Sequence, residues 1–368
     1  MTLQLISQLG LIGLFAGAIP LIYSALRGKA QSFSRLTWLV LFCTFDLIIF
    51  GAFTRLTDSG LGCPDWPGCY GHSNPLLAMD KILSAQDQMP FGPVSVSKAW
   101  VEMLHRYFAM GVGFLIILLS ITAWFRRAEF GKKTFIFSLG LLLLVCLQGA
   151  FGAWTVTLRL QPIIVTTHLL LALLLLVGLA SLTEISANPV LKKPLGTRFP
   201  IWVAGIGIIV LFCQVFLGGW VSTNYAVLAC RDFPLCNGQW IPEMDLSSGF
   251  SLWRALGETN SGTFIDIKAL VGIHWVHRLG AVIALFTIFS VWRNIQRSIP
   301  KDNHLWNKAT HRWASILGAL GMIQLLTGLS NIVLEWPLFA ALAHTAGAAA
   351  LLVCMTKLVF LAMADDEI

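Results

Sequence analysis

The chain has 368 residues, of which 57% are hydrophobic and only 12% are charged, and its mean hydropathy is +0.76. Soluble domains carry about 25% charged residues, so this composition excludes an ordinary soluble protein and is typical of a polytopic membrane protein. The net charge of +7 is expected to reside in basic cytoplasmic loops and gives no reason to expect a nucleic-acid partner.

Nine apolar runs are long enough to cross a bilayer as helices. They cover residues 3–26, 36–56, 101–125, 134–157, 163–184, 200–222, 269–292, 310–333 and 338–362. Basic residues follow the first run and do not precede it, so we expect a retained span and not a cleaved signal peptide.

Lysine and arginine residues gather in alternate connections between these runs, which places those connections in the cytoplasm. The residues are Arg27, Lys29, Arg35, Arg126, Arg127, Lys132, Lys133, Lys192, Lys193, Arg198, Arg293, Arg297, Lys301, Lys308 and Arg312. The two long loops, 57–100 and 223–268, then lie in the periplasm of a Gram-negative cell. The sequence therefore predicts a multi-pass protein of the cell inner membrane.

Each long loop contains one copy of a short cysteine motif. "CPDWPGC" spans Cys63–Cys69 and "CRDFPLC" spans Cys230–Cys236, with Asp, an aromatic residue and Pro at positions three to five of both copies. In an oxidising compartment, a disulfide within each motif is the favoured interpretation. A zinc site with His72 as a further ligand is the alternative, and free thiols are the third. The remaining cysteines are expected to be core residues: Cys43, Cys146, Cys213 and Cys354.

The cysteine motif belongs to a longer internal repeat. "GAFTRLTDSGLGC" from Gly51 aligns without a gap with "GGWVSTNYAVLAC" from Gly218, 167 residues later. The His-Arg dipeptide at His105 recurs at His277, 172 residues later. Three further residues recur in the same order at a spacing of 176: Gln148, Gly152 and His168 match Gln324, Gly328 and His344.

The repeat predicts an all-α membrane protein of two four-helix bundles in the same orientation, related by a pseudo-twofold axis along the membrane normal. Residues 36–198 would form the first bundle and residues 199–368 the second. Residues 1–35, an extra N-terminal span with its basic loop, would belong to neither bundle.

Four of the eight histidines occupy matched positions in the repeat. His105 pairs with His277 and His168 with His344, each about four to eight residues, or roughly 6–12 Å, from the outer end of its span. Two imidazoles facing each other across a four-helix bundle are a usual way to hold a haem iron. His274 is the rival of His277, but only His277 shares the His-Arg dipeptide with His105.

The residues beside these histidines differ between the copies. Arg106 and Arg278 are candidate partners of haem propionates, with snorkelling to the membrane interface as the alternative. Glu102 lies on the same helical face as His105, whereas the matching position of the second copy holds His274. Because the acid accompanies just one of the two haem sites, we expect the two sites to do different jobs. A solvent-exposed acid at a helix start is the alternative.

Three segments together resemble haem A synthases, the bacterial and mitochondrial enzymes that mature haem for cytochrome c oxidase. They are "TRLTDSGLGCPDWPGCYG" from Thr54, "EMLHR" from Glu102 and "VHRLGA" from Val276. The resemblance covers about residues 36–362 and implies oxidation of the C8 methyl group of haem O to a formyl group by successive hydroxylations. Family members usually have eight spans, so the leading span is a departure.

The resemblance also implies roles for the matched residues. Two histidine pairs would hold the two haems: His105 and His168 the substrate haem O, and His277 and His344 a haem b. Glu102 would be the catalytic acid. The Cys63–Cys69 pair would bear on activity, and the Cys230–Cys236 pair would be structural.

Two other classes of protein compete with this interpretation. A bis-His dihaem cytochrome b that carries electrons would account for the histidines but not for Glu102 or the cysteine motifs. A transporter would account for the repeat but not for the shortage of buried charges. Candidate partners are an electron donor, a haem O synthase and a second copy of this chain, besides haem O and the lipid bilayer.

Overall fold

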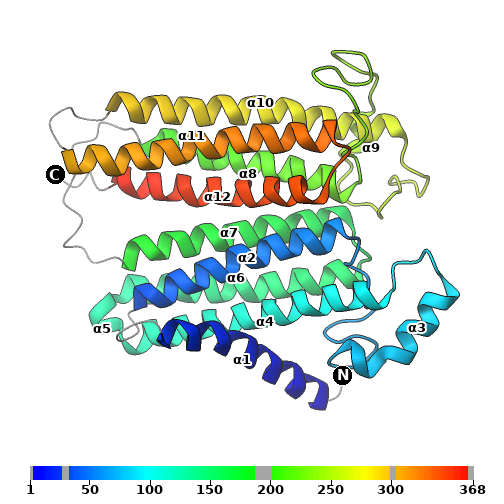
Figure 1. Cartoon of the computed structure of the whole chain (residues 1–368), viewed down its shortest axis with the longest axis horizontal. Helices are drawn as coiled ribbons and strands as arrows, with labels where there is room; N and C mark the ends of the chain where they lie inside the picture. The colour runs from blue at the N-terminus through cyan, green and yellow to red at the C-terminus, as the bar shows by residue number, and fades with distance from the viewer. Residues whose placement is uncertain (1–2, 27–32, 187–200, 299–303, 364–368) are drawn as a thin grey trace. The chain divides into compact units, whose positions relative to one another are not determined.

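A computed structural model of the chain describes residues 3–26, 33–186, 201–298 and 304–363. The chain divides into two compact units, residues 1–186 and 187–368. Nine helices within the described residues are long and apolar enough to cross a membrane. The protein is therefore an all-helical, multi-pass membrane protein (Figure 1).

In the first unit, four long helices form a closed ring. They are α2 (Phe33–Leu56), α4 (Val96–Phe125), α6 (Lys132–Thr157) and α7 (Pro162–Ser186). Helix α2 packs against α4 and α7, and α6 packs against the same two helices. Helices α4 and α7 therefore lie diagonally opposite each other across the bundle.

The extra helix α1 (Leu3–Leu26) lies outside this ring and packs against α4 (Figure 1). The approach is close, because a Cβ atom at Gly17 would lie 2.5 Å from Phe114 Cδ1. At the start of α1, Leu5 and Leu9 are buried in one cluster with both cysteines of the first motif. The extra span therefore packs over the first cysteine loop, a contact that the sequence did not predict.

The second unit has the same ring of helices. Its members are α8 (Ile201–Thr223), α10 (Ile267–Ser298), α11 (His304–Val333) and α12 (Leu338–Met363). Helix α8 packs against α10 and α12, and α11 also packs against both. Helices α10 and α12 are thus the diagonal pair. How the two rings are related to each other, including the twofold axis, stays a prediction.

Each predicted span coincides with one of these helices, and the differences lie at polar ends. Helix α4 begins at Val96, ahead of its apolar run, because Ser95 Oγ accepts a hydrogen bond from the Lys98 amide (3.3 Å) and caps the helix. Helix α10 continues to Ser298 with Arg297 in its last turn. Hydropathy marks the membrane-spanning part of a helix and not its polar extensions.

Short helices lie in the connections. They are η1 (Pro75–Ala78) and α3 (Met79–Gln88) in the first long loop, α5 (Arg127–Phe130) between α4 and α6, and α9 (Leu246–Gly249) in the second long loop. The predicted boundary between residues 198 and 199 lies outside the described residues. The same holds for several predicted cytoplasmic residues: Arg27, Lys29, Lys192, Lys193, Arg198, Lys301 and the side chain of Lys308.

Candidate functional site

The aspartate at the third position of the cysteine motif organises the first loop. Asp65 Oδ1 accepts a hydrogen bond from the Tyr70 amide (2.6 Å), and Oδ2 accepts one from the Gly71 amide (2.7 Å). Tyr70 and Gly71 have φ angles of +50° and +80°, which turn the chain sharply after the second cysteine. The carboxylate therefore stabilises a tight turn that closes the loop.

The second loop is closed by the same contacts. Asp232 Oδ1 accepts a hydrogen bond from the Asn237 amide (2.5 Å) and Oδ2 one from the Gly238 amide (2.8 Å). The Gly238 amide has the largest effect on the Asp232 carboxylate and, with the Asn237 amide and the Arg278 charge, holds its pKa below the ordinary value. The repeated Asp in the motif is thus explained by the turn that follows it.

Both cysteine pairs are disulfides in the structure: Cys63–Cys69 and Cys230–Cys236. Their sulfurs are not free to bind zinc, and the described residues contain no group of three or more His, Cys, Asp or Glu side chains placed to hold a metal ion. Of the remaining cysteines, Cys43 and Cys354 are buried as expected. The expectation is wrong for Cys146 and Cys213, which are exposed on their helices, because a small apolar thiol suits a lipid-facing surface as well as a core.

One arginine holds each loop to the long helix beneath it. Arg106 Nη1 donates hydrogen bonds to the carbonyl oxygens of Asp65 (2.9 Å) and Gly68 (2.6 Å). Arg278 Nη1 donates to the carbonyl oxygens at the two matching positions of the second loop (2.8 and 2.7 Å). These guanidinium groups thus contact the loops; a contact with haem propionates stays a prediction.

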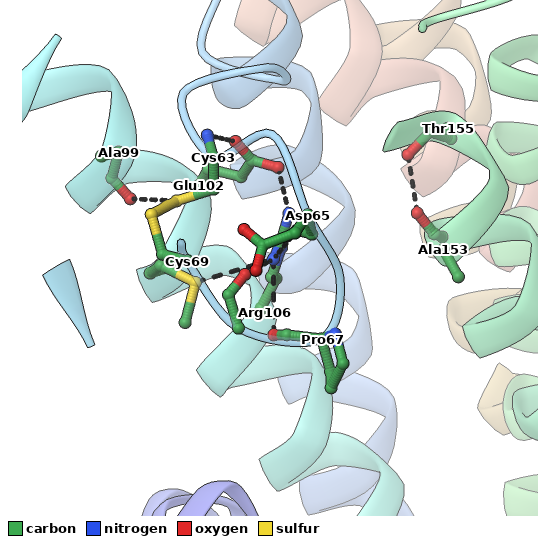
Figure 2. A network of polar contacts seen from close by, with 12 residues as sticks. Cys63, Asp65, Pro67, Cys69, Ala99, Glu102, Arg106, Ala153 and Thr155 are labelled. Atoms are coloured by element: carbon green, nitrogen blue, oxygen red, sulfur yellow. Dashed lines mark hydrogen bonds and ion pairs between the residues drawn. A yellow bond between two sulfur atoms is a disulfide. The ribbon is translucent and has the colours of Figure 1, made fainter. Parts of the chain in front are cut away.

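In the first unit, the loop and its arginine meet a buried carboxylate (Figure 2). Glu102 is 4% exposed, and its Oε2 accepts a hydrogen bond from the Cys63 amide (2.8 Å). Its Oε1 accepts one from Arg106 Nη2 (2.5 Å), which makes an ion pair. Glu102 is therefore not a solvent-exposed acid at a helix start, because α4 begins more than one turn earlier and the loop covers it.

In the second unit, an imidazole takes the place of this carboxylate. His274 is 3% exposed; its Nδ1 lies 3.4 Å from the Cys230 amide, and its Nε2 lies 3.2 Å from Arg278 Nε. These contacts are longer than those of Glu102, as expected when an anionic acceptor is absent. Both ring nitrogens of His274 are directed to the loop and its arginine, which leaves His277 as the histidine on the bundle side.

The four matched histidines lie on the diagonal helices of their bundles: His105 on α4 and His168 on α7, His277 on α10 and His344 on α12. In each unit, the two imidazoles are within electrostatic range of each other. Each ring also packs over a glycine of the preceding long helix, where a Cβ atom would lie 3.0–3.4 Å from the ring Cε1. The pairs are Gly51 with His105, Gly152 with His168, Gly218 with His277 and Gly328 with His344.

A matched glutamine supports the second histidine of each unit. Gln148 Nε2 donates a hydrogen bond to the backbone carbonyl oxygen of His168 (3.0 Å), and Gln324 Nε2 donates one to that of His344 (2.9 Å). These glutamines and the four glycines are matched in the sequence repeat, but the sequence predicted no role for them. The structure shows that they join the histidine-bearing helix to its neighbour and make room for the ring.

This donor set fits a haem in each unit. Two imidazoles, with no third metal-ligating side chain beside them among the described residues, suit a group that brings its own nitrogen ligands and needs few from the protein. Side chains on facing helices of a bundle core are a common setting for such groups. In each unit, His105 or His277 would provide one axial ligand and His168 or His344 the other.

Comparison with known proteins agrees with this geometry. Residues 34–356 match the family described as COX15-CtaA, cytochrome oxidase assembly protein. A heme A synthase of Shewanella oneidensis is 36% identical over 333 residues, which cover 88% of this chain and 96% of the relative. Heme A synthases of Mesorhizobium japonicum and Chelativorans sp. are each 30% identical, over 83% and 84% of this chain and 84% and 85% of the relatives. The chain belongs to the COX15-CtaA family of cytochrome oxidase assembly proteins.

Proposed function

We propose that the protein is a haem A synthase, an oxidoreductase that converts haem O to haem A by oxidising the C8 methyl group to a formyl group. Membership of the family and the names of the relatives support this activity. Within the chain, one observation carries the proposal. Two matched pairs of imidazoles are present, but in the part of the chain that the structure describes only the first pair is accompanied by a buried ion pair, between Glu102 and Arg106.

We assign the substrate haem O to the first unit, between His105 and His168. The support is the position of Glu102, three residues before His105 and on the same face of α4. We assign a haem b to the second unit, where His277 and His344 would hold its iron. A bound haem b would supply one-electron redox chemistry.

Glu102 is the proposed catalytic residue. Each of the two hydroxylations inserts one oxygen atom into a C–H bond of the methyl group and passes two electrons to an oxidant from outside the chain, and the resulting gem-diol loses water to give the formyl group. A fixed carboxylate can take up a proton or stabilise positive charge at that carbon. The Cys63 amide and Arg106 Nη2 hold the two oxygens of Glu102, so its charge has a defined position on α4 between the cysteine loop and the histidine.

We further propose that the protein lies in the cell inner membrane with its cysteine loops in the periplasm. The support in the first unit is the position of the basic residues: α4 runs from the cysteine loop to Arg126, and Lys132 and Lys133 begin α6 at that same end. An electron donor, a haem O synthase and a second copy of the chain remain candidate partners.

Expression of the chain together with a haem O synthase tests the activity. Extracted haems would be separated by chromatography and identified by mass, with cells that express the haem O synthase alone as the control. We expect haem A and its hydroxylated precursor only when this chain is present. If haem b is bound but neither product forms, the chain is a dihaem electron carrier and the proposal is wrong.

A further inference from the structure

The imidazoles of the two units differ in what their Nδ1 atoms contact. In the first unit, Nδ1 of His105 and Nδ1 of His168 are both buried and have no hydrogen-bond partner among the described residues. The second unit provides two contacts: Thr327 Oγ1 with His344 Nδ1 (2.9 Å) and Gln214 Nε2 with His277 Nδ1 (3.1 Å). The matched rings therefore share their glycine supports but not their polar partners.

The contact with Thr327 favours a proton on Nδ1 of His344. The Thr327 hydroxyl group has one proton and lies within reach of the carbonyl oxygens of Ile323 (2.7 Å) and Gln324 (3.3 Å) and of His344 Nδ1 (2.9 Å). The Ile323 carbonyl oxygen is the nearest of the three, and when Thr327 donates to it, Oγ1 accepts from His344, so Nδ1 is protonated and Nε2 keeps its lone pair. A hydrogen-bonded Nδ1–H orients the ring and makes Nε2 a stronger donor to a metal.

Gln214 on α8 is placed to do the same for His277. Its Nε2 lies 3.1 Å from His277 Nδ1 and 3.1 Å from the His277 carbonyl oxygen. Its Oε1 is buried and has no partner in the part of the chain that the structure describes. Exchange of the amide oxygen and nitrogen would present this oxygen to a protonated Nδ1 in place of the hydrogen bond to the His277 carbonyl oxygen, which leaves Nε2 of the ring as the metal ligand.

The difference in Nδ1 contacts between the units follows from the residues at matching positions of the sequence. Thr327 lies one residue before Gly328, and the matching residue before Gly152 is Phe151. Gln214 lies four residues before Gly218, and the matching residue before Gly51 is Leu47. Phenylalanine and leucine have no acceptor, so the first unit cannot form either contact at these positions.

We propose that Thr327 and Gln214 are positioning residues that anchor the two imidazoles of the second unit. Phe151 and Leu47, at the matching positions of the first unit, leave its two imidazoles without such an anchor, so that a haem bound between them can be exchanged. The inference rests on the proposed function, in which the second unit retains haem b while the first admits haem O and releases haem A. A haem that stays bound needs firmly held histidines, whereas the histidines of a substrate site must release the haem after the reaction.

Thr327→Val tests the inference in the full-length protein purified with its haem. Valine matches threonine in shape and removes the hydroxyl group, which contacts both His344 Nδ1 and the Ile323 carbonyl oxygen. We expect the second-unit haem to bind about 10- to 100-fold more weakly, measured by its transfer to apomyoglobin. We also expect its reduction midpoint potential to rise, because the axial imidazole of His344 donates less. Thr327→Ser keeps the hydroxyl group and should restore both values.

Thr345→Val is the matched control, because Thr345 follows His344 but its hydroxyl donates to the Ala341 carbonyl oxygen (3.2 Å). If Thr327→Val equals this control in haem release and in midpoint potential, the inference is wrong. Phe151→Thr is the reciprocal change, and we expect slower release of haem from the first unit with the second-unit potential unchanged. If haem leaves the first unit at equal rates in Phe151→Thr and in the unmodified protein, the claim that Phe151 keeps this haem exchangeable is wrong.

The outcome is separable from that of the proposed function. If the unmodified protein makes haem A and Thr327→Val has no effect, the activity stands and the anchoring is wrong. If no haem A forms but Thr327→Val still shifts the midpoint potential, the anchoring stands and the activity is wrong.

Discussion

The two cysteine loops share nearly all their contacts and differ in the charge beneath them. Each loop turns around an aspartate, is closed by a disulfide and is held by an arginine of the long helix below. The first arginine pairs with Glu102, whereas the second meets His274. Since the second loop is held with no carboxylate at the position of Glu102 on the helix, holding the loop to its helix does not require one. The buried acid of the first unit therefore points to a use beyond structure.

In the histidine pairs, the additional polar contacts belong to the second unit and not to the first. Both rings of the first unit lack a partner at Nδ1 within the described chain, whereas Gln214 and Thr327 contact the rings of the second unit. The first unit thus combines an acid with unanchored rings, and the second combines anchored rings with an imidazole in place of the acid. This division matches a substrate site and a resident-haem site on one duplicated scaffold.

The largest expected effect separates His277 from its neighbour His274. We expect His277→Ala to abolish the b-type spectrum of the second unit, because it removes an axial ligand. His274→Ala should retain that spectrum and loosen the loop at Cys230. The measurement is a reduced-minus-oxidised difference spectrum of each purified variant. Loss of the spectrum in His274→Ala alone would place the ligand one helical turn earlier.

The next effect concerns the acid that only the first unit has. We expect Glu102→Gln to keep haem b and to slow conversion of haem O at least about 100-fold, because general acid–base catalysis typically contributes that much. Loss of the counter-charge of Arg106 should also destabilise the protein by about 3–5 kcal/mol, since breaking a buried ion pair leaves a buried charge. Haem analysis and thermal unfolding would measure the two effects.

Glu129→Gln is the matched control for this change, because it removes a carboxylate from an ion pair with Arg126 (2.6 Å) in which both side chains are largely exposed. An exposed pair contributes about 0–1 kcal/mol, so both activity and stability should stay close to those of the unmodified protein. Full conversion of haem O by Glu102→Gln would remove Glu102 from the mechanism.

A smaller effect is expected where helix α1 covers the first cysteine loop. In Gly17→Leu, the new side chain would collide with Phe114, and overpacking of this kind costs about 1–3 kcal/mol. We expect α1 to separate from α4 and the Cys63–Cys69 disulfide to be reduced roughly 10-fold faster by a soluble thiol. The Cys230–Cys236 disulfide, which residues of its own unit bury, serves as the internal reference.

Gly10→Leu on the same helix is the control, because nothing lies within 4 Å of a Cβ atom at that position. It should leave both reduction rates unchanged. Equal rates for Gly17→Leu and Gly10→Leu would show that α1 does not protect the first disulfide.

The smallest effect is a pH dependence of the second loop. The folded protein holds the pKa of Asp232 below its ordinary value of 3.8, chiefly through the Gly238 amide. Its stabilisation of the loop is therefore complete above the ordinary pKa and is lost as the pH falls through the lower, folded value. We expect phosphine reduction of the Cys230–Cys236 disulfide to become faster only in that acid range. In Asp232→Asn, the fast rate should be present at neutral pH; a slow rate there would contradict this role.

Much of the fold was predictable because hydropathy reports the membrane-spanning part of each helix. The family was also predictable, because the segment from Thr54 and the two His-Arg dipeptides are distinctive, and the comparisons confirm it. Hydropathy cannot say which side of a helix faces the core, so the exposed Cys146 and Cys213 were assigned wrongly. It also gave no sign that Leu9 of α1 packs with Cys63, 54 residues later in the chain.

The candidate site was predictable where its residues repeat, and at Glu102, which lies on one helical face with a repeated histidine. The repeat identified four histidines, but it could not show that Arg106 and Arg278 donate to loop carbonyl groups, since their acceptors are backbone atoms. Gln214 and Thr327 were not predicted for a different reason: each lies on another helix than the histidine that it contacts, whereas Glu102 lies on the helix of His105.

The division of labour between the units is tested most directly by identifying the haems that remain after one histidine is removed from each. His168→Ala and His344→Ala would be expressed with a haem O synthase, and the haems of each purified variant identified by chromatography and mass. We predict that His168→Ala retains haem b and forms no haem A, whereas His344→Ala loses haem b. Loss of haem b from His168→Ala, or its full retention in His344→Ala, would contradict the account.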